Sequence, residues 1–271
     1  MRLRILGPLV VSDAMGRPCG PQGPKLRTLL ATLLTEHGRV VLTDRLLREH
    51  WGGRPRHTAR NALQVAISEL RRRLRDNGLA PAVAAIVTHP SGYLMEIDSR
   101  EFDLPRFETD LVCARTAGER GELDEAAGLV ARALSLWRGP ALADVRGGPM
   151  LAAEACRLNE LRTAAQELRF AVELRRGRSA HLIGELYALA AEHPLRERVH
   201  ESLMIALHDQ GRPAEALQVY SRIRLALQTQ LGLEPGPGLR RIQRIVLTRG
   251  PRVRSAPSGH SPALTGRSKV S

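Results

Sequence analysis

The sequence lacks the residue patterns that the common catalytic and metal-binding sites require. We find no GxxxxGK[ST] phosphate-binding loop, no GxSxG nucleophile elbow and no HExxH zinc motif. Its three cysteines, Cys19, Cys113 and Cys156, lie too far apart to form a CxxC unit. An odd number of scattered cysteines suits a reducing compartment. These absences argue against an enzyme and predict neither a cofactor nor a metal site.

Long apolar runs are also missing. No run approaches the roughly 20 residues that a helix needs to cross a bilayer. The N-terminal stretch MRLRILGPLVV begins with basic residues, but its apolar part is short and Asp13 soon follows, unlike a signal peptide. We therefore expect a cytoplasmic protein.

Lysine is scarce, since Lys25 and Lys269 are the only two among 41 basic residues. The net charge of +13 is unevenly distributed. Residues 1–100 hold sixteen basic and eight acidic side chains, residues 101–250 hold 21 and 20, and residues 251–271 hold four and none. A genomic preference for arginine explains a high isoelectric point but not this contrast. The basic first third indicates local binding of a polyanion.

Residues 1–100 have the apolar pattern of short strands around three helices. Gly and Pro separate the segments, and a HPSG turn joins the last two strands. The expected elements are strands near Leu3–Val11 and at Val40–Val41, helices over 25–36 and 58–75, and a hairpin of 86–88 with 93–97. Between the first two helices we expect another, capped by Thr43 or Asp44, with Leu46, Leu47 and Trp51 facing inward. These are the parts of a winged helix-turn-helix.

The helix expected over residues 58–75 has two distinct faces at 100° per residue. One face is apolar and should pack on the domain: Ala59, Leu63, Ala66, Ile67, Leu70 and Leu74. The opposite face and its flanks carry the candidate base-reading residues: Asn61, Gln64, Val65, Ser68, Glu69 and Arg72. Such a helix can pack with one side and enter a DNA groove with the other.

The outer face has the chemistry that the major groove demands. Arginine can bridge O6 and N7 of guanine, asparagine or glutamine can bridge N6 and N7 of adenine, and glutamate can accept from N4 of cytosine. A solvated helix face is the alternative reading. Val65 at the centre of the face and three consecutive arginines, Arg71, Arg72 and Arg73, favour DNA.

Other basic and wing residues are candidates for supporting contacts. Phosphate contacts position a domain without reading sequence, and the candidates are Lys25, Arg27, Arg54, Arg56, Arg60, Arg71 and Arg75. In the hairpin the candidate wing residues are His89, Ser91, Gly92 and Tyr93. His89 lies at the tip, where it could enter the minor groove.

Residues 101–250 differ in kind, because nearly every segment reads as helix. GELDEAA at Gly121–Ala127 resembles GRPAEAL at Gly211–Leu217, a glycine turn before a helix with small residues. This is typical of tetratricopeptide helix pairs, which bind proteins. A bundle that serves only dimerisation is the alternative. Residues 251–271 are rich in Pro, Ser and Gly and are expected to be a disordered basic tail. The expected fold is therefore mainly α, with a winged helix before an all-α, tetratricopeptide-like domain.

Several long motifs resemble the SARP family (Streptomyces antibiotic regulatory proteins). In the first region they are GPKLRTLLATLL, LTDRLLREHWGG, TARNALQVAISELRRRL and SGYLMEI. In the second they include FDLPRFE, LSLWRGPAL, QGRPAEALQVYSRIRLAL and QLGLEPGPGLRRIQRIVL. The resemblance covers residues 3–248. It implies an OmpR-type winged helix over 1–100 and a bacterial transcriptional activation domain over 101–250.

The resemblance also implies a function. Family members activate an antibiotic or other secondary-metabolite gene cluster, bind direct repeats near the −35 promoter region and contact RNA polymerase and its sigma factor. Repeats about one helical turn apart would place paired proteins on one face of the duplex, so a dimer or paired binding is expected at the nucleoid. The chain resembles the small members of the family. It departs from the pattern at Glu69, where related sequences often have arginine, and in a wing without its frequent arginine.

Two other functions compete with a sequence-reading activator: a protein-interaction adaptor that binds nucleic acid without sequence preference, and a repressor. Replacing Arg72 or Asn61 by alanine distinguishes the sequence-reading activator from the adaptor. A loss of about 1–3 kcal/mol of binding free energy on the specific DNA site, but not on random DNA, would indicate base reading.

Overall fold

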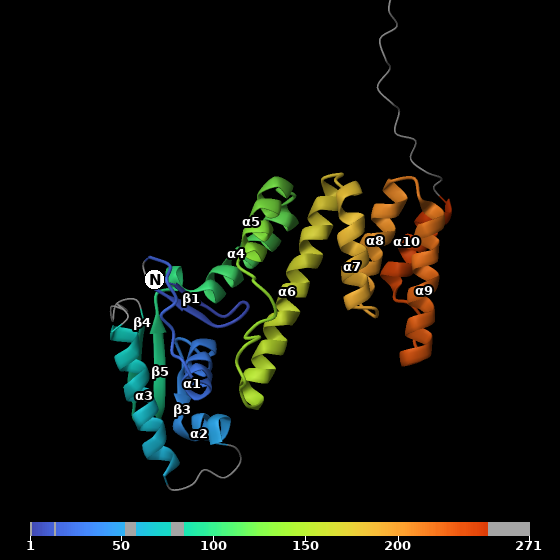
Figure 1. Cartoon of the computed structure of the whole chain (residues 1–271). Coiled ribbons are helices and arrows are strands. Elements are labelled where there is room, and N and C mark those ends of the chain that lie inside the picture. Colours follow the sequence, from blue (N-terminus) through green and yellow to red (C-terminus); the bar gives the residue numbers. More distant parts are fainter. Residues whose placement is uncertain (1, 14, 52–57, 77–83, 249–271) are drawn as a thin grey trace, which may run out of the picture. The chain divides into compact units, whose positions relative to one another are not determined.

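The computed structural model describes residues 2–13, 15–51, 58–76 and 84–248. Its backbone contacts divide the chain into two compact units, Met1–Arg176 and Gly177–Ser271. Helices predominate in both units, and the strands of the described residues all belong to the first (Figure 1). The mainly α fold expected from the sequence is confirmed.

Two small antiparallel sheets form part of the first unit. Strands β1 (Arg2–Arg4) and β2 (Val10–Ser12) make the first sheet, and β3 (Val40–Leu42), β5 (Gly92–Ile97) and β4 (Ala84–His89) make the second, in that order. A Cβ on Gly92 would lie 2.0 Å from the carbonyl oxygen of Val41 on the neighbouring strand. Only glycine fits at this close approach, so Gly92 lets strand β3 approach the wing strand next to the hairpin turn.

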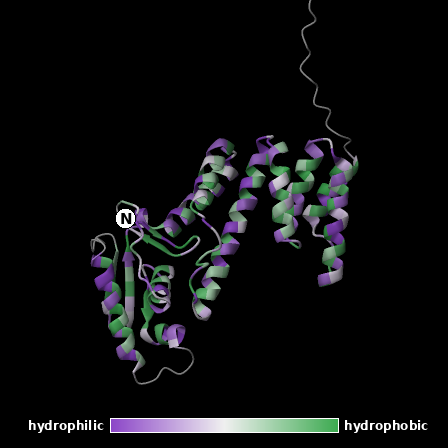
Figure 2. Cartoon of the chain, viewed as in Figure 1, coloured by the Kyte–Doolittle hydropathy of each residue, from purple (hydrophilic) through white to green (hydrophobic). Residues whose placement is uncertain are grey.

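Three helices complete the winged helix: α1 (Pro24–Thr35), α2 (Thr43–Trp51) and α3 (Ala59–Asp76). The expected stripe of α3 is buried at Ala59, Leu63, Ile67, Leu70 and Leu74, while its other side is polar (Figure 2). Both the helix and its inward face were therefore predicted correctly from apolar periodicity.

The first unit continues well past residue 100. It includes α4 (Asp103–Arg120), α5 (Leu123–Ser135) and α6 (Pro149–Arg175). One cluster of buried apolar side chains runs from Leu3 of the winged helix to Ala165 of α6. The winged helix and these helices thus share a core, whereas the domain division at residue 100 stays a prediction from sequence.

The second unit holds α7 (Ile183–Glu192), α8 (Glu197–Asp209), α9 (Pro213–Leu231) and α10 (Pro237–Thr248). The α8–α9 turn repeats the α4–α5 turn. Gly121 and Gly211 both have positive φ, and the N–H groups of Glu122 and Arg212 each donate to the carbonyl five residues earlier at 2.9 Å. This is the Schellman arrangement, and it explains why the two sequence segments look alike.

None of the helices over the described residues is long and apolar enough to cross a membrane. Those same stretches contain no group of three or more His, Cys, Asp or Glu side chains that could hold a metal ion. The tail at 251–271 and the candidate phosphate residues Arg54 and Arg56 lie outside the described residues.

Candidate nucleic-acid interface

All six candidate base-reading residues line one open hollow of about 630 Å³ along α3. Val65 at its centre is 68% exposed although it is apolar. Exposure of a large aliphatic side chain between polar ones wastes apolar surface in water, but it suits contact with a thymine methyl group. The described structure therefore brings the predicted set together on one surface.

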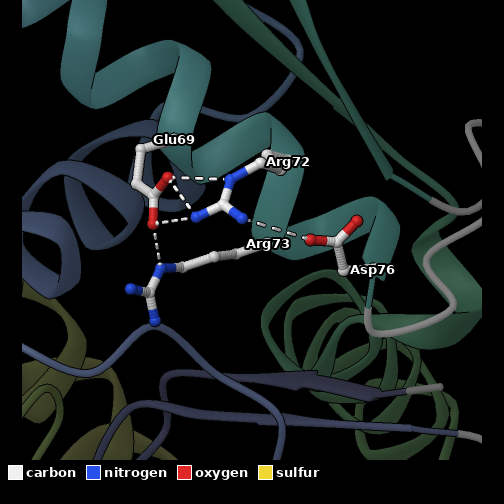
Figure 3. A network of polar contacts seen from close by, with 4 residues as sticks. All are labelled: Glu69, Arg72, Arg73 and Asp76. Atoms are coloured by element: carbon white, nitrogen blue, oxygen red, sulfur yellow. Dashed lines mark hydrogen bonds and ion pairs between the residues drawn. The ribbon is translucent and has the colours of Figure 1, made fainter.

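A network of ion pairs lies at one side of this surface and includes Glu69, Arg72, Arg73 and Asp76 (Figure 3). Arg72 donates to Glu69 from Nε at 3.0 Å and from Nη2 at 2.7 and 2.9 Å. Arg73 Nε donates to Glu69 Oε1 at 2.6 Å, and Arg72 Nη1 lies 3.8 Å from Asp76. These hydrogen bonds, first from Arg72 and then from Arg73, hold the pKa of Glu69 below its ordinary value. Glu69 is therefore charged and already bonded to two arginines.

Arg71 lies off the exposed face and connects α3 to the wing. Its Nε donates to the carbonyl of Ile86 at 2.9 Å, and its Nη2 donates to Oγ1 of Thr88 at 2.8 Å. Both acceptors lie on β4. Arg71 thus fixes the position of strand β4 relative to α3, a contact inside the fold that the expected phosphate role did not include.

Arg27 also makes hydrogen bonds to other residues of the first unit. Its Nη2 pairs with the carboxylate of Asp144 and donates to the carbonyl of Leu9 at 3.0 Å, while the Leu9 N–H donates to Asp144 at 2.7 Å. Asp144 follows α5 and lies 117 positions from Arg27. No local pattern could reveal this partner, and the predicted phosphate contact of Arg27 would compete with it.

Three of the expected phosphate residues, Lys25, Arg60 and Arg75, are exposed. Arg60 lies 3.1 Å from Asp44, and both side chains of the pair are largely exposed. Exposed ion pairs contribute little stability, so the Arg60 guanidinium can exchange Asp44 for a phosphate at small cost.

The wing residues divide into two groups. His89 and Ser91 are exposed at the tip, with His89 Nδ1 and Ser91 Oγ 2.9 Å apart. Gly92 and Tyr93 are buried and shape the strand. A second hollow, of about 550 Å³, lies between α3 and this hairpin and is lined by Arg60, Gln64 and His89 among others. The wing tip and α3 thus border one hollow with both polar and apolar walls.

Two carboxylates, one buried and one half-buried, join the winged helix to the following helices. Asp103 accepts hydrogen bonds from the N–H groups of Ile5, at 2.9 Å, and Leu6, at 3.1 Å. Burial raises the pKa of Asp103 to about 6. Glu49 of α2 accepts from the N–H groups of Met150 and Leu151 at 3.1 and 3.0 Å. Glu49 thereby caps α6, whose own N-cap residue is Gly148.

Comparison with known proteins defines the class of this chain. Residues 21–95 match the family described as "Transcriptional regulatory protein, C terminal", and residues 102–247 match "Bacterial transcriptional activator domain". A DNA-binding winged helix of OmpR type followed by such a domain defines a transcriptional regulator.

Similar whole proteins narrow the class to a family. The chain is 37% identical to Regulatory protein DnrI of Streptomyces peucetius, covering 93% of both chains. It is 37% identical to Regulatory protein AfsR of Streptomyces coelicolor, covering 93% of this chain but 24% of that one. The solved Mycobacterium tuberculosis EmbR, in complex with a low-affinity phosphopeptide, matches with a TM-score of 0.86 and 32% identity over 92% of this chain and 65% of EmbR. The chain belongs to the SARP family of regulators.

Proposed function

We propose that this regulator activates transcription of a secondary-metabolite gene cluster by reading promoter DNA with the exposed face of α3. The observation that supports the proposal is the hollow on α3, where Asn61, Val65, Ser68 and Arg72 face solvent opposite a fully packed apolar stripe. Hydrogen-bonding side chains surround the single apolar side chain of Val65 there, and both kinds of group can distinguish base pairs in the major groove.

Supporting contacts come from around this face. Lys25, Arg60 and Arg75 are exposed and would neutralise phosphates, and Arg54 and Arg56 remain candidates for the same role. His89 and Ser91 at the wing tip lie where a hairpin can approach the neighbouring groove. Arg27 and Arg71 instead stabilise the domain, because their donors are used by Asp144 and by strand β4.

Activation requires a second contact, with RNA polymerase and its sigma factor, and we assign it to the helical region over 101–250. Family membership supports this assignment, as does the repeated helix-hairpin architecture, which commonly binds protein. Paired copies on direct repeats about one helical turn apart would face the same side of the duplex.

Genome-wide mapping of the bound sites, followed by deletion of the gene, tests the proposal. We expect bound sites upstream of a biosynthetic cluster and lower transcripts of that cluster in the deletion strain. Raised transcripts would indicate a repressor. Binding without sequence preference, together with unchanged transcripts, would indicate an adaptor.

A further inference from the structure

The Glu69 carboxylate lies beside the base-reading face with both oxygens already occupied. Oε1 accepts from Arg72 and Arg73, and Oε2 accepts twice from Arg72. To accept from N4 of a cytosine, this carboxylate would have to give up charge-assisted hydrogen bonds, which are about twice as strong as neutral ones. Direct cytosine reading is therefore the less favourable use of Glu69.

The same hydrogen bonds leave one edge of Arg72 available. A guanidinium has five N–H donors in a planar fork. Glu69 takes the edge formed by Nε and Nη2; the two contacts from Nη2 go to the two oxygens of one carboxylate and so lie on the same side of this nitrogen. Among the residues that the structure describes, Nη1 has only Asp76 nearby, at 3.8 Å, beyond hydrogen-bond distance. The remaining edge, Nη1 with the second N–H of Nη2, is the bidentate pair that matches O6 and N7 of guanine. Arg72 is 60% exposed, so this edge is accessible.

We propose that Glu69 is a positioning residue that holds Arg72 in the orientation for reading guanine and does not itself contact a base. This inference rests on the proposed DNA-reading function. An unrestrained arginine loses rotamer freedom when it binds, at about 0.5–1.5 kcal/mol for such a side chain, and a preformed pair avoids part of that cost.

The test uses four forms of the full chain: wild type, Glu69→Ala, Arg72→Ala and the double variant. DNA selected by the wild type from a random duplex library serves as the specific probe, and a scrambled duplex of equal composition serves as its reference. We expect Glu69→Ala to lower the ratio of specific to scrambled affinity about two- to tenfold. In the Arg72→Ala background the same change should leave the ratio unaltered.

Asp76→Ala is the matched control, because Asp76 also lies next to Arg72 but makes no close hydrogen bond to it. Removing this charge should strengthen binding to both duplexes by the same factor. Glu69→Gln keeps an acceptor for Arg72 and should restore part of the lost ratio. An equal effect of Glu69→Ala and Asp76→Ala on the ratio would reduce Glu69 to a surface charge and overturn the proposal.

Two further results separate this proposal from the proposed function. An effect of Glu69→Ala that persists in the Arg72→Ala background would show that Glu69 contacts DNA directly. That result would contradict the positioning role of Glu69 but leave the proposed base reading by α3 standing. A wild type that selects no sequence would overturn both. Independently of DNA, the Arg72 Nε–H signal in NMR should be protected from solvent exchange in the wild type and lose protection in Glu69→Ala; equal exchange in the two proteins would contradict the pairing.

Discussion

The outer face of α3 and the joint between the winged helix and α4–α6 use charged residues in opposite ways. On α3, Arg72 is exposed and its partner Glu69 is half-buried, and their hydrogen bonds can be rearranged by a ligand. At the joint, Asp103 and Glu49 are buried or half-buried and bind backbone N–H groups far away in sequence. The first arrangement suits recognition, and the second fixes the surface that recognises. Mutations in the two regions should therefore separate binding from stability.

The largest effect is expected at the joint, from Asp103→Ala. The change leaves the buried N–H groups of Ile5 and Leu6 without their acceptor, which should lower the free energy of unfolding by about 2–4 kcal/mol. Chemical denaturation of the purified chain measures it. Unchanged stability would mean that the N-terminal strands do not depend on this carboxylate.

The next effect is expected on α3, from Arg72→Ala compared with Arg71→Ala. Arg72→Ala should weaken binding to the selected DNA by about 1–3 kcal/mol with little effect on stability. Arg71→Ala, which breaks the contact with β4, should lower stability as well. If Arg72→Ala destabilised the fold as much as Arg71→Ala, the proposed difference between a DNA-binding role for Arg72 and a structural role for Arg71 would be contradicted. Titration of each variant with DNA, alongside thermal unfolding, makes the comparison.

Glu49→Ala should have a smaller effect on stability, about 1–2 kcal/mol, because it removes the carboxylate that caps α6. Glu36→Ala provides a control, since among the described residues the Glu36 carboxylate pairs only with Arg45, at 3.7 Å. Denaturation curves should separate the two variants. Equal midpoints would show that the cap contributes nothing.

The smallest effect concerns pH. Because burial raises the pKa of Asp103 to about 6, the folded chain binds this proton more tightly than the unfolded chain does. The stabilisation that comes from protonated Asp103 is therefore fully present below the pKa of Asp103 in the unfolded chain, near 4. It is lost as the pH rises through the folded value of about 6. Wild type should gain about 1 kcal/mol over Asp103→Asn between pH 7 and pH 5. A constant difference would contradict the raised pKa.

Local pattern predicted most of the fold and which side chains lie on the exposed face of α3. The period of apolar residues located α3 and its buried face, and the glycine turns located the two helix hairpins, because both signals lie within a few residues. The pairing of Glu69 with Arg72 and Arg73 was also legible, at spacings of three and four. In contrast, the partner of Arg27 lies 117 positions away and those of Glu49 about a hundred. Such contacts depend on tertiary packing, and the surface arginines alone do not reveal them.

Methylation interference at guanine N7 tests the central claim most directly, because this atom lies in the major groove. On the selected DNA, wild type should show interference at guanines within each repeat, and Arg72→Ala should lose the signal at one of them while keeping the others. Binding that tolerates methylation of every guanine N7, or an unchanged pattern in Arg72→Ala, would contradict guanine reading from the exposed face of α3.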